Sequence, residues 1–197
     1  KIMSKVTSTS QWQELQCDLN KLTRWAEKWQ MKFNIEKCKV LHIGSNNVQA
    51  KYVMNNVPLA SAENEKDLGV VVSKDLKPSK HCTEAVKNAN KLVGFIGRTF
   101  EFKSEKVILT LYNSLVRPQL EYCVQFWSPY YRKDIEKLEK IQRRVTKMIP
   151  RLRNKPYEER LEALNLFSLT KRRIRGDLNQ VFKMFQGYNN LDVNKYF

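Results

Sequence analysis

The chain has 197 residues, of which 42% are hydrophobic, so it can bury a core in one or two small domains and is not a disordered protein. Its 36 Lys and Arg against 20 Asp and Glu give a formal net charge of +16, which indicates a polyanionic partner or a strongly solvated surface. Four widely spaced cysteines and two histidines suggest neither a zinc site nor a disulfide framework, and they predict free thiols. No apolar run is long enough to span a bilayer, and the start lacks the apolar core of a signal peptide, so we expect an intracellular protein without membrane contact.

Residues 1–44 predict a helix that leads through a tight turn into a short strand. Apolar residues at one-turn spacing mark the packed face of a helix over residues 11–31, which a Ser or Thr at 8–10 can cap. The residues of this face are Leu15, Leu19, Leu22, Trp25 and Trp29. Asn34 supplies the turn, and residues 38–43 alternate as a strand. Lys37 lies at the entrance to this strand, where spacing alone favours a solvated charge.

Residues 52–73 predict the remainder of a small antiparallel sheet. Asn55-Asn56 between two short apolar runs indicates a hairpin, because Asn tolerates the left-handed backbone of a two-residue turn. Residues 66–73 are expected to form one buried strand that ends at Lys74-Asp75. The first 76 residues therefore predict a long helix packed on a small sheet.

From Pro78 onward the apolar pattern is helical. A stripe between residues 85 and 96 predicts a helix to about Phe100, and Ser104 begins another helix. Pro118 is expected to bend that second helix, because proline lacks an amide donor and clashes with the preceding turn.

Three aromatic residues and one His-Cys pair in this region invite functional interpretations. Tyr122, Phe126 and Trp127 have a spacing that could stack bases, but we favour a role in the core. His81 and Cys82 are neighbours that point in different directions on a helix, and no third ligand is evident. Neither a metal site nor a catalytic dyad is predicted there.

The strongest electrostatic feature is a helix expected from Ser128-Pro129 to about Ile149. Its basic residues recur at intervals of four, three, four and three, which places them on one narrow face apart from the apolar face. They are Lys133, Lys137, Lys140, Arg144 and Lys147. Such a face suits a nucleic-acid backbone, which attracts Lys and Arg regardless of sequence. A solvated face is the alternative, because three acidic residues dilute the charge near the start of the helix.

Further basic residues crowd the ends of the neighbouring predicted helices. Residues 76–197 hold 25 Lys and Arg against 12 Asp and Glu, whereas residues 1–75 hold 11 against 8. The additional candidates for backbone contacts are Arg143, Arg151, Arg153, Lys171, Arg172 and Arg173. The second part of the chain is therefore the predicted nucleic-acid-binding part.

Residues 25–38 carry the pattern W-x3-W-x-M-x-F-N-x-x-K-C. Its members are Trp25, Trp29, Met31, Phe33, Asn34, Lys37 and Cys38. The pattern resembles motif D of the reverse transcriptases of non-long-terminal-repeat (LINE, jockey-like) retrotransposons. By this resemblance, Lys37 is a catalytic residue that would donate a proton to the pyrophosphate leaving group or stabilise it.

Two later segments extend the resemblance over most of the chain. Residues 65–70, EKDLGV, resemble motif E, the primer-grip hairpin, in which Leu68 and Gly69 would shape the grip. Residues 115–122, LVRPQLEY, with Phe126-Trp127, resemble the start of the segment beyond it. The two active-site aspartates of the family, in an F/Y-x-D-D hairpin, would lie just before Lys1, and the chain contains no Asp-Asp pair. The resemblance implies a piece of an RNA-directed DNA polymerase.

The sequence thus predicts an α+β chain with a partial palm at residues 1–76 and an all-helical, thumb-like region at residues 77–197. Its expected partners are an RNA or DNA template-primer duplex and an upstream fingers and palm portion of the polymerase. No cofactor is expected in this chain, since Mg²⁺ would be held by the aspartates of the complete enzyme.

Alone, the chain is expected to bind nucleic acid in the cytoplasm or nucleus without polymerising. A domesticated, non-catalytic nucleic-acid-binding module and a helical interaction protein with an acidic partner remain alternatives.

Overall fold

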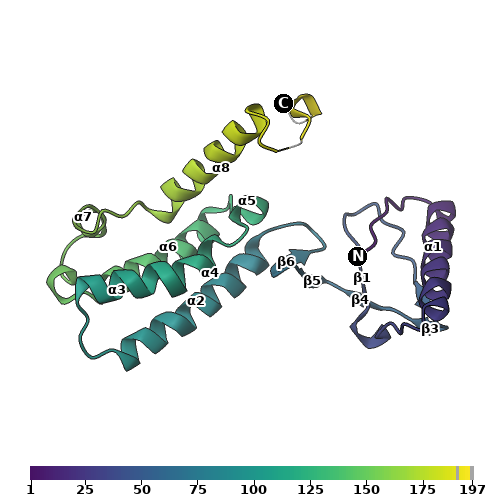
Figure 1. Ribbon diagram of the computed structural model, residues 1–197, viewed down its shortest axis with the longest axis horizontal. Helices are drawn as coiled ribbons and strands as arrows, with labels where there is room; N and C mark the ends of the chain where they lie inside the picture. The colour runs from purple at the N-terminus through teal and green to yellow at the C-terminus, as the bar shows by residue number, and fades with distance from the viewer. Residues whose placement is uncertain (190, 196–197) are drawn as a thin grey trace. The chain divides into compact units, whose positions relative to one another are not determined.

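The computed structural model describes residues 1–189 and 191–195, and it divides into two compact units, Lys1–Lys77 and Pro78–Phe197 (Figure 1). The division falls beside the boundary predicted between residues 76 and 77. A long helix and short strands make up the first unit and helices the second, so the predicted α+β class is confirmed. Among the described residues, no helix has both the length and the apolar character needed to cross a bilayer.

The first unit contains one long helix, a 3₁₀ turn and six short strands. In chain order these are α1 (Thr9–Lys28), η1 (Ile35–Lys37), β1 (Lys39–Leu41), β2 (Val53–Met54), β3 (Val57–Pro58), β4 (Ala60–Ala62), β5 (Asn64–Asp67) and β6 (Val70–Ser73). Ser8 caps α1, as expected, because its side chain accepts a hydrogen bond from the backbone N–H of Gln11.

The inward face of α1 differs from the predicted one. Ala26 is buried and the three leucines of the stripe are half-buried, but Trp25 and Trp29 are exposed. The prediction that both tryptophans pack inward was wrong. Ala26 continues the inward face one turn after Leu22, and Trp25, one residue earlier, is turned away from it by about 100°. Trp29 follows the last residue of α1, Lys28.

The strands pair as three two-stranded sheets. β2 with β3 is antiparallel, as predicted, and β5 with β6 is also antiparallel, whereas β1 and β4 are parallel rather than part of the predicted antiparallel sheet, with Lys39 opposite Ala60. The connection between β1 and β4 is long enough for β4 to lie beside β1 and run in the same direction. Asn55 and Asn56 have φ values of 51° and 60° at the β2–β3 turn, so the predicted hairpin is confirmed.

The β5–β6 hairpin replaces the single strand predicted over residues 66–73. Leu68 and Gly69, with φ values of 45° and 90°, form its turn, and Asp67 pairs with Val70. Gly69 permits the left-handed backbone that reverses the chain. Leu68 is strained there and its side chain is 86% exposed.

Replacing Leu68 with Asn is therefore expected to raise the free energy of unfolding of the first unit by about 1 kcal/mol, because Asn tolerates left-handed φ. Urea titration followed by tryptophan fluorescence measures this, since Trp12, Trp25 and Trp29 all belong to this unit. Leu68→Ala is the matched control, as it shortens the side chain but keeps the strain. Equal stability of the two variants would contradict the prediction.

The second unit is helical. Its elements are α2 (Ser79–Thr99), α3 (Glu105–Leu111), the π-helical turn η2 (Tyr112–Val116), α4 (Arg117–Glu121), α5 (Val124–Trp127), α6 (Arg132–Thr146), η3 (Pro150–Leu152), α7 (Tyr157–Ala163), α8 (Leu169–Phe185) and η4 (Val193–Lys195). Its core includes Ala89 and Val93 of α2 and Leu138 and Ile141 of α6, and these two helices pack together.

The segment before Pro118 widens into a π turn. The N–H of Arg117 bonds to the carbonyl of Tyr112, five residues back, and α4 follows with Pro118 near its start. Proline provides no donor, so the wider turn brings the chain into a helix that can begin there.

The aromatic residues after α4 do not all enter the core. Trp127 is buried, but Tyr122 is exposed and Phe126 is 71% exposed, so the prediction of a core role was correct for Trp127 alone. Cys123 has a φ of 50°, which interrupts the helix between α4 and α5. Helical spacing therefore does not hold across these three residues.

A buried network of polar side chains connects η2, α6, α7 and the start of α8. The Tyr112 hydroxyl donates to Oε1 of Gln142, and Nε2 of Gln142 donates to the Tyr157 hydroxyl at 3.0 Å and to the Phe167 carbonyl at 3.0 Å. The Tyr157 hydroxyl in turn donates to Glu139. Gln142, which is 1% exposed, takes part in three of these hydrogen bonds and is therefore the centre of this network.

All four cysteines are free thiols in the structure, as predicted. Cys17 and Cys123 are exposed, Cys38 is partly exposed and Cys82 is buried. His81, beside Cys82, packs edge-on against the Trp127 ring at 4.5 Å between centroids.

Candidate nucleic-acid interface

Helix α6 presents the predicted basic face while burying its other sides. Leu138, Ile141 and Val145 are in the core, and Asp134 in the first turn is also fully buried. The Ser79 hydroxyl of α2 donates to Asp134, and Lys137 bonds to it at 3.2 Å. These contacts fix the rotation of α6 about its axis, and so they fix the direction in which its cations point.

The cations of α6 differ in how far they are committed to protein contacts. Lys133, Lys140 and Lys147 are exposed and have no carboxylate partner among the described residues. Lys137 is half-exposed beside Asp134, and Arg144 donates to Asn90 of α2 at 3.1 Å. The three lysines are therefore the best candidates for contacts with a polyanion.

Arg143 borders the same face and rests on an aromatic ring. Its guanidinium lies 4.8 Å from the centroid of the Tyr157 ring, and the side chain is exposed. Arg160 lies 5.4 Å from that centroid and donates to the carbonyl of Arg143 at 2.9 Å. Arg160 is buried, and this burial lowers the pKa of its guanidinium. Arg160 therefore supports the position of Arg143.

The connection after α6 adds two further exposed cations. Arg153 and Lys155 are exposed without a carboxylate partner among the described residues. Arg151 is exposed as well, but it pairs with Glu105 of α3. A single exposed pair contributes little stability, so Arg151 can still reach a phosphate.

The basic residues at the start of α8 do not form the surface that the sequence predicted. Arg172 binds Glu121 through two hydrogen bonds, at 2.5 and 3.0 Å, and these bonds raise the pKa of its guanidinium. Arg173 is buried, and burial lowers its pKa. The burial of Arg173 does not fit a contact with a phosphate backbone. Of Lys171, Arg172 and Arg173, Lys171 alone is exposed without a carboxylate partner in the described part of the chain.

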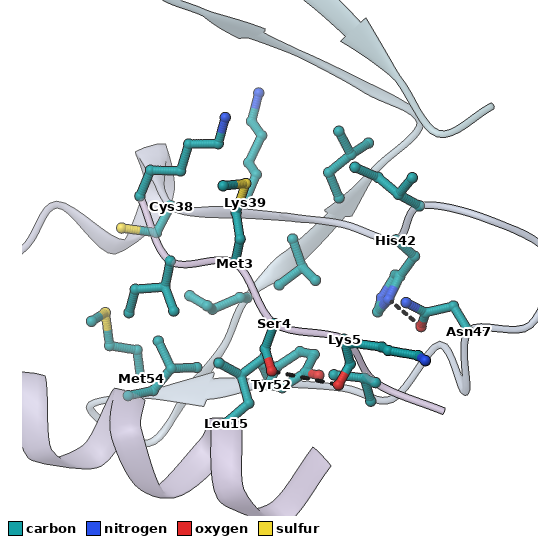
Figure 2. A pocket seen from close by; sticks show the side chains of 18 of the residues that line it. Met3, Ser4, Lys5, Leu15, Cys38, Lys39, His42, Asn47, Tyr52 and Met54 are labelled. Atoms are coloured by element: carbon teal, nitrogen blue, oxygen red, sulfur yellow. Dashed lines mark hydrogen bonds between the residues drawn. The ribbon is translucent and has the colours of Figure 1, made fainter. Parts of the chain in front are cut away.

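Lys37 of the first unit is one of the residues that line a cavity of about 890 Å³. The side chain of Asn34 accepts a hydrogen bond from the backbone N–H of Lys37, so Asn34 caps η1. The cavity is lined mainly by apolar side chains of α1, β1, β2 and the start of the chain, including Leu15, Met54 and Met3 (Figure 2). The structure thus places Lys37 beside an apolar hollow, with its side chain exposed.

Leu68 and Gly69 lie at the tip of the β5–β6 hairpin, described above. Both belong to the first unit, as does Lys37.

Sequence reasoning missed three residues that contact the arginines of the candidate interface. Asn90, Tyr157 and Arg160 each contact an α6 arginine from another element. None has a motif or a spacing that marks it, since the contacts join residues far apart in the chain.

Comparisons with known protein families, with curated proteins and with solved structures found no match to this chain. The family resemblance therefore depends on the sequence motifs alone.

Proposed function

We propose that this chain is the template-primer-binding part of a retrotransposon-type reverse transcriptase, without the catalytic aspartates. In this proposal Lys133 and Lys140 of α6, and Lys147 directly after its last residue, contact the phosphate backbone, assisted by Arg143 and Arg153. Lys37 would assist departure of pyrophosphate, and the Leu68-Gly69 turn would touch the primer. The chain would act in the cytoplasm or nucleus, together with an upstream fingers and palm portion.

The observation that carries the proposal is the row of unneutralised lysines on α6. They recur every seven residues, so they lie about 10 Å apart along the helix, close to three phosphate steps along one strand. Buried contacts on the other sides of α6 hold this row in a fixed orientation. A rigid row of cations binds a backbone at a lower entropic cost than flexible lysines on a loop.

The residues present do not fit a catalytic metal site. Among the described residues, no group of three or more His, Cys, Asp or Glu side chains could hold a metal ion. No step of the proposal therefore passes through Mg²⁺, and the chain alone is expected to bind a duplex without extending it.

The test is the binding of the full chain to an RNA–DNA hybrid across a salt series, beside the variant Lys133→Ala, Lys140→Ala, Lys147→Ala. We expect the affinity to fall steeply as salt rises. In a plot of the logarithm of the binding constant against the logarithm of the salt concentration, the slope of the variant should be smaller in magnitude by about two to three, because each phosphate contact releases about one counterion. The variant's affinity at low salt should fall by roughly tenfold or more.

The matched control is Lys28→Ala, Lys32→Ala, Lys51→Ala, which removes the same charge from exposed lysines of the first unit. It should keep most of the salt slope. Equal losses in the two triple variants would show that only net charge matters and would contradict the assignment to α6.

A further inference from the structure

Helix α8 carries a row of large apolar side chains on its exposed side. Ile174, Leu178, Phe182 and Phe185 are each between 55% and 64% exposed. Their spacing of four, four and three residues places them on one face of the helix. Together they form the α8 stripe, which follows the helix for about 16 Å.

The first turns of α8 are firmly seated, and the rest of the helix is not. Leu169 and Arg173 are buried, Ser168 caps the helix, and Arg172 binds Glu121. After Arg173, no described residue of α8 is buried. Figure 1 shows this later part, in yellow-green, leading away from the packed helices of its own unit.

The seating of α8 turns the α8 stripe away from the core. Gly176 lies on the inward side, where an added Cβ would meet Nε2 of Gln125 at 3.3 Å. Ile174 and Leu178, two residues to either side of Gly176, point outward and are exposed. A row of exposed large apolar side chains on a helix that is anchored at its first turns is typical of a protein-docking surface.

Charge along one border of the stripe selects the kind of partner. Lys171 and Arg175 lie one turn apart beside the stripe, and both are exposed without a carboxylate partner in the described part of the chain. Asp177 is the one acidic residue of α8, against five basic ones. A partner with acidic side chains along one edge would meet this border favourably.

The same charges disfavour two other occupants. A second copy of α8 would bring no acidic edge to this border, because Asp177 is its one acidic residue. A nucleic-acid strand could pair its phosphates with Lys171 and Arg175 and stack bases on Phe182 and Phe185, but it would leave the aliphatic side chains of Ile174 and Leu178 in water.

We propose that the α8 stripe docks an amphipathic helix of a partner protein. Its apolar face would pack on Ile174, Leu178 and Phe182, and Asp or Glu along one edge would meet Lys171 and Arg175. This inference is independent of duplex binding, which is assigned to α6.

The experiment is a selection of helical peptides from a randomised display library on the immobilised full chain. The library is first depleted on the variant Leu178→Gln, Phe182→Gln, which removes the apolar side chains without adding charge, so that peptides needing the stripe remain. Both positions are mostly exposed, so this variant should fold, and an unchanged circular dichroism spectrum checks that. We expect the recovered peptides to be amphipathic and net negative.

A recovered peptide is then titrated by fluorescence anisotropy. Binding should weaken at least tenfold with Arg175→Glu, and at least tenfold when the acidic residues of the peptide are changed to Lys. Phe102→Asp, a change at an exposed phenylalanine between α2 and α3, should leave binding unchanged.

Several results would overturn the proposal. One is a selection that recovers no peptide binding the chain better than the depletion variant. Another is a set of recovered peptides in which Asp and Glu do not exceed Lys and Arg. Sedimentation showing a dimer that Leu178→Gln, Phe182→Gln dissociates would assign the stripe to a second copy. Flotation with vesicles of anionic phospholipid that requires the stripe would assign it to a membrane surface.

Discussion

Replacing Gln142 with Ala is expected to lower the free energy of unfolding of the helical unit by about 3 to 5 kcal/mol. The change removes the partner of the Tyr112 hydroxyl and the donor to the Phe167 carbonyl, and it leaves a cavity in a fully buried place. Each buried polar group left without a partner costs about 1 to 3 kcal/mol, and the cavity adds to this. Urea unfolding followed by circular dichroism measures the loss.

Gln119→Ala is the matched control, because Gln119 is an exposed residue of α4 and its loss should change stability by less than about 0.5 kcal/mol. A cycle with Tyr112→Phe separates the network from simple packing. If Gln142 and Tyr112 act through their shared hydrogen bond, the double variant should lose less than the sum of the single losses. Additive losses would mean that the hydrogen bond contributes little.

The helical unit is also expected to lose stability steeply in alkaline solution. Burial raises the pKa of the Cys82 thiol from its ordinary 9.0 to about 11. In the unfolded chain the thiol ionises near pH 9, whereas the folded protein keeps the proton, so the folded state binds more protons above pH 9. Stability is therefore complete below pH 9 and falls as pH rises to 11, by about 2 to 3 kcal/mol for Cys82 alone.

Two buried tyrosines act in the same direction. Burial raises the pKa of Tyr112 and of Tyr157, and the hydrogen bond from Tyr157 to Glu139 adds to the second shift. Unfolding free energies measured between pH 8 and 11 should therefore decline, and Cys82→Ala should flatten the decline between pH 9 and 11. Cys123→Ala, at an exposed thiol, should leave the slope unchanged, and an unaltered slope in Cys82→Ala would refute the role of burial.

Helical period predicted the α6 face well because it depends on residues close in sequence. The spacing from Lys133 to Lys147 fixes which side chains share a face, and the structure exposes that face. The helical period cannot predict which distant parts of the chain pack against a face. Arg172 and Arg173 look like any exposed basic run, but Glu121, 51 residues away, binds the first, and packing buries the second.

Local backbone conformation accounts for other differences from the prediction. Cys123 in the left-handed region and the turn at Leu68-Gly69 each break a regular period that the sequence seemed to continue. Leucine and cysteine are rare in such a conformation, so Cys123 and Leu68 do not mark these sites in advance, and Gly69 alone carries a preference for it. Asn55-Asn56, in contrast, carries that preference, and there the hairpin was predicted.

The placement of the cysteines makes the chain convenient for distance measurements by fluorescence energy transfer. Cys17 and Cys123 are both exposed, and each belongs to a different unit, whereas Cys82 is shielded by the core. With Cys38 changed to Ser, donor and acceptor dyes would attach to one thiol in each unit. Adding a duplex to such a doubly labelled chain would report directly whether binding brings the two units to a new separation.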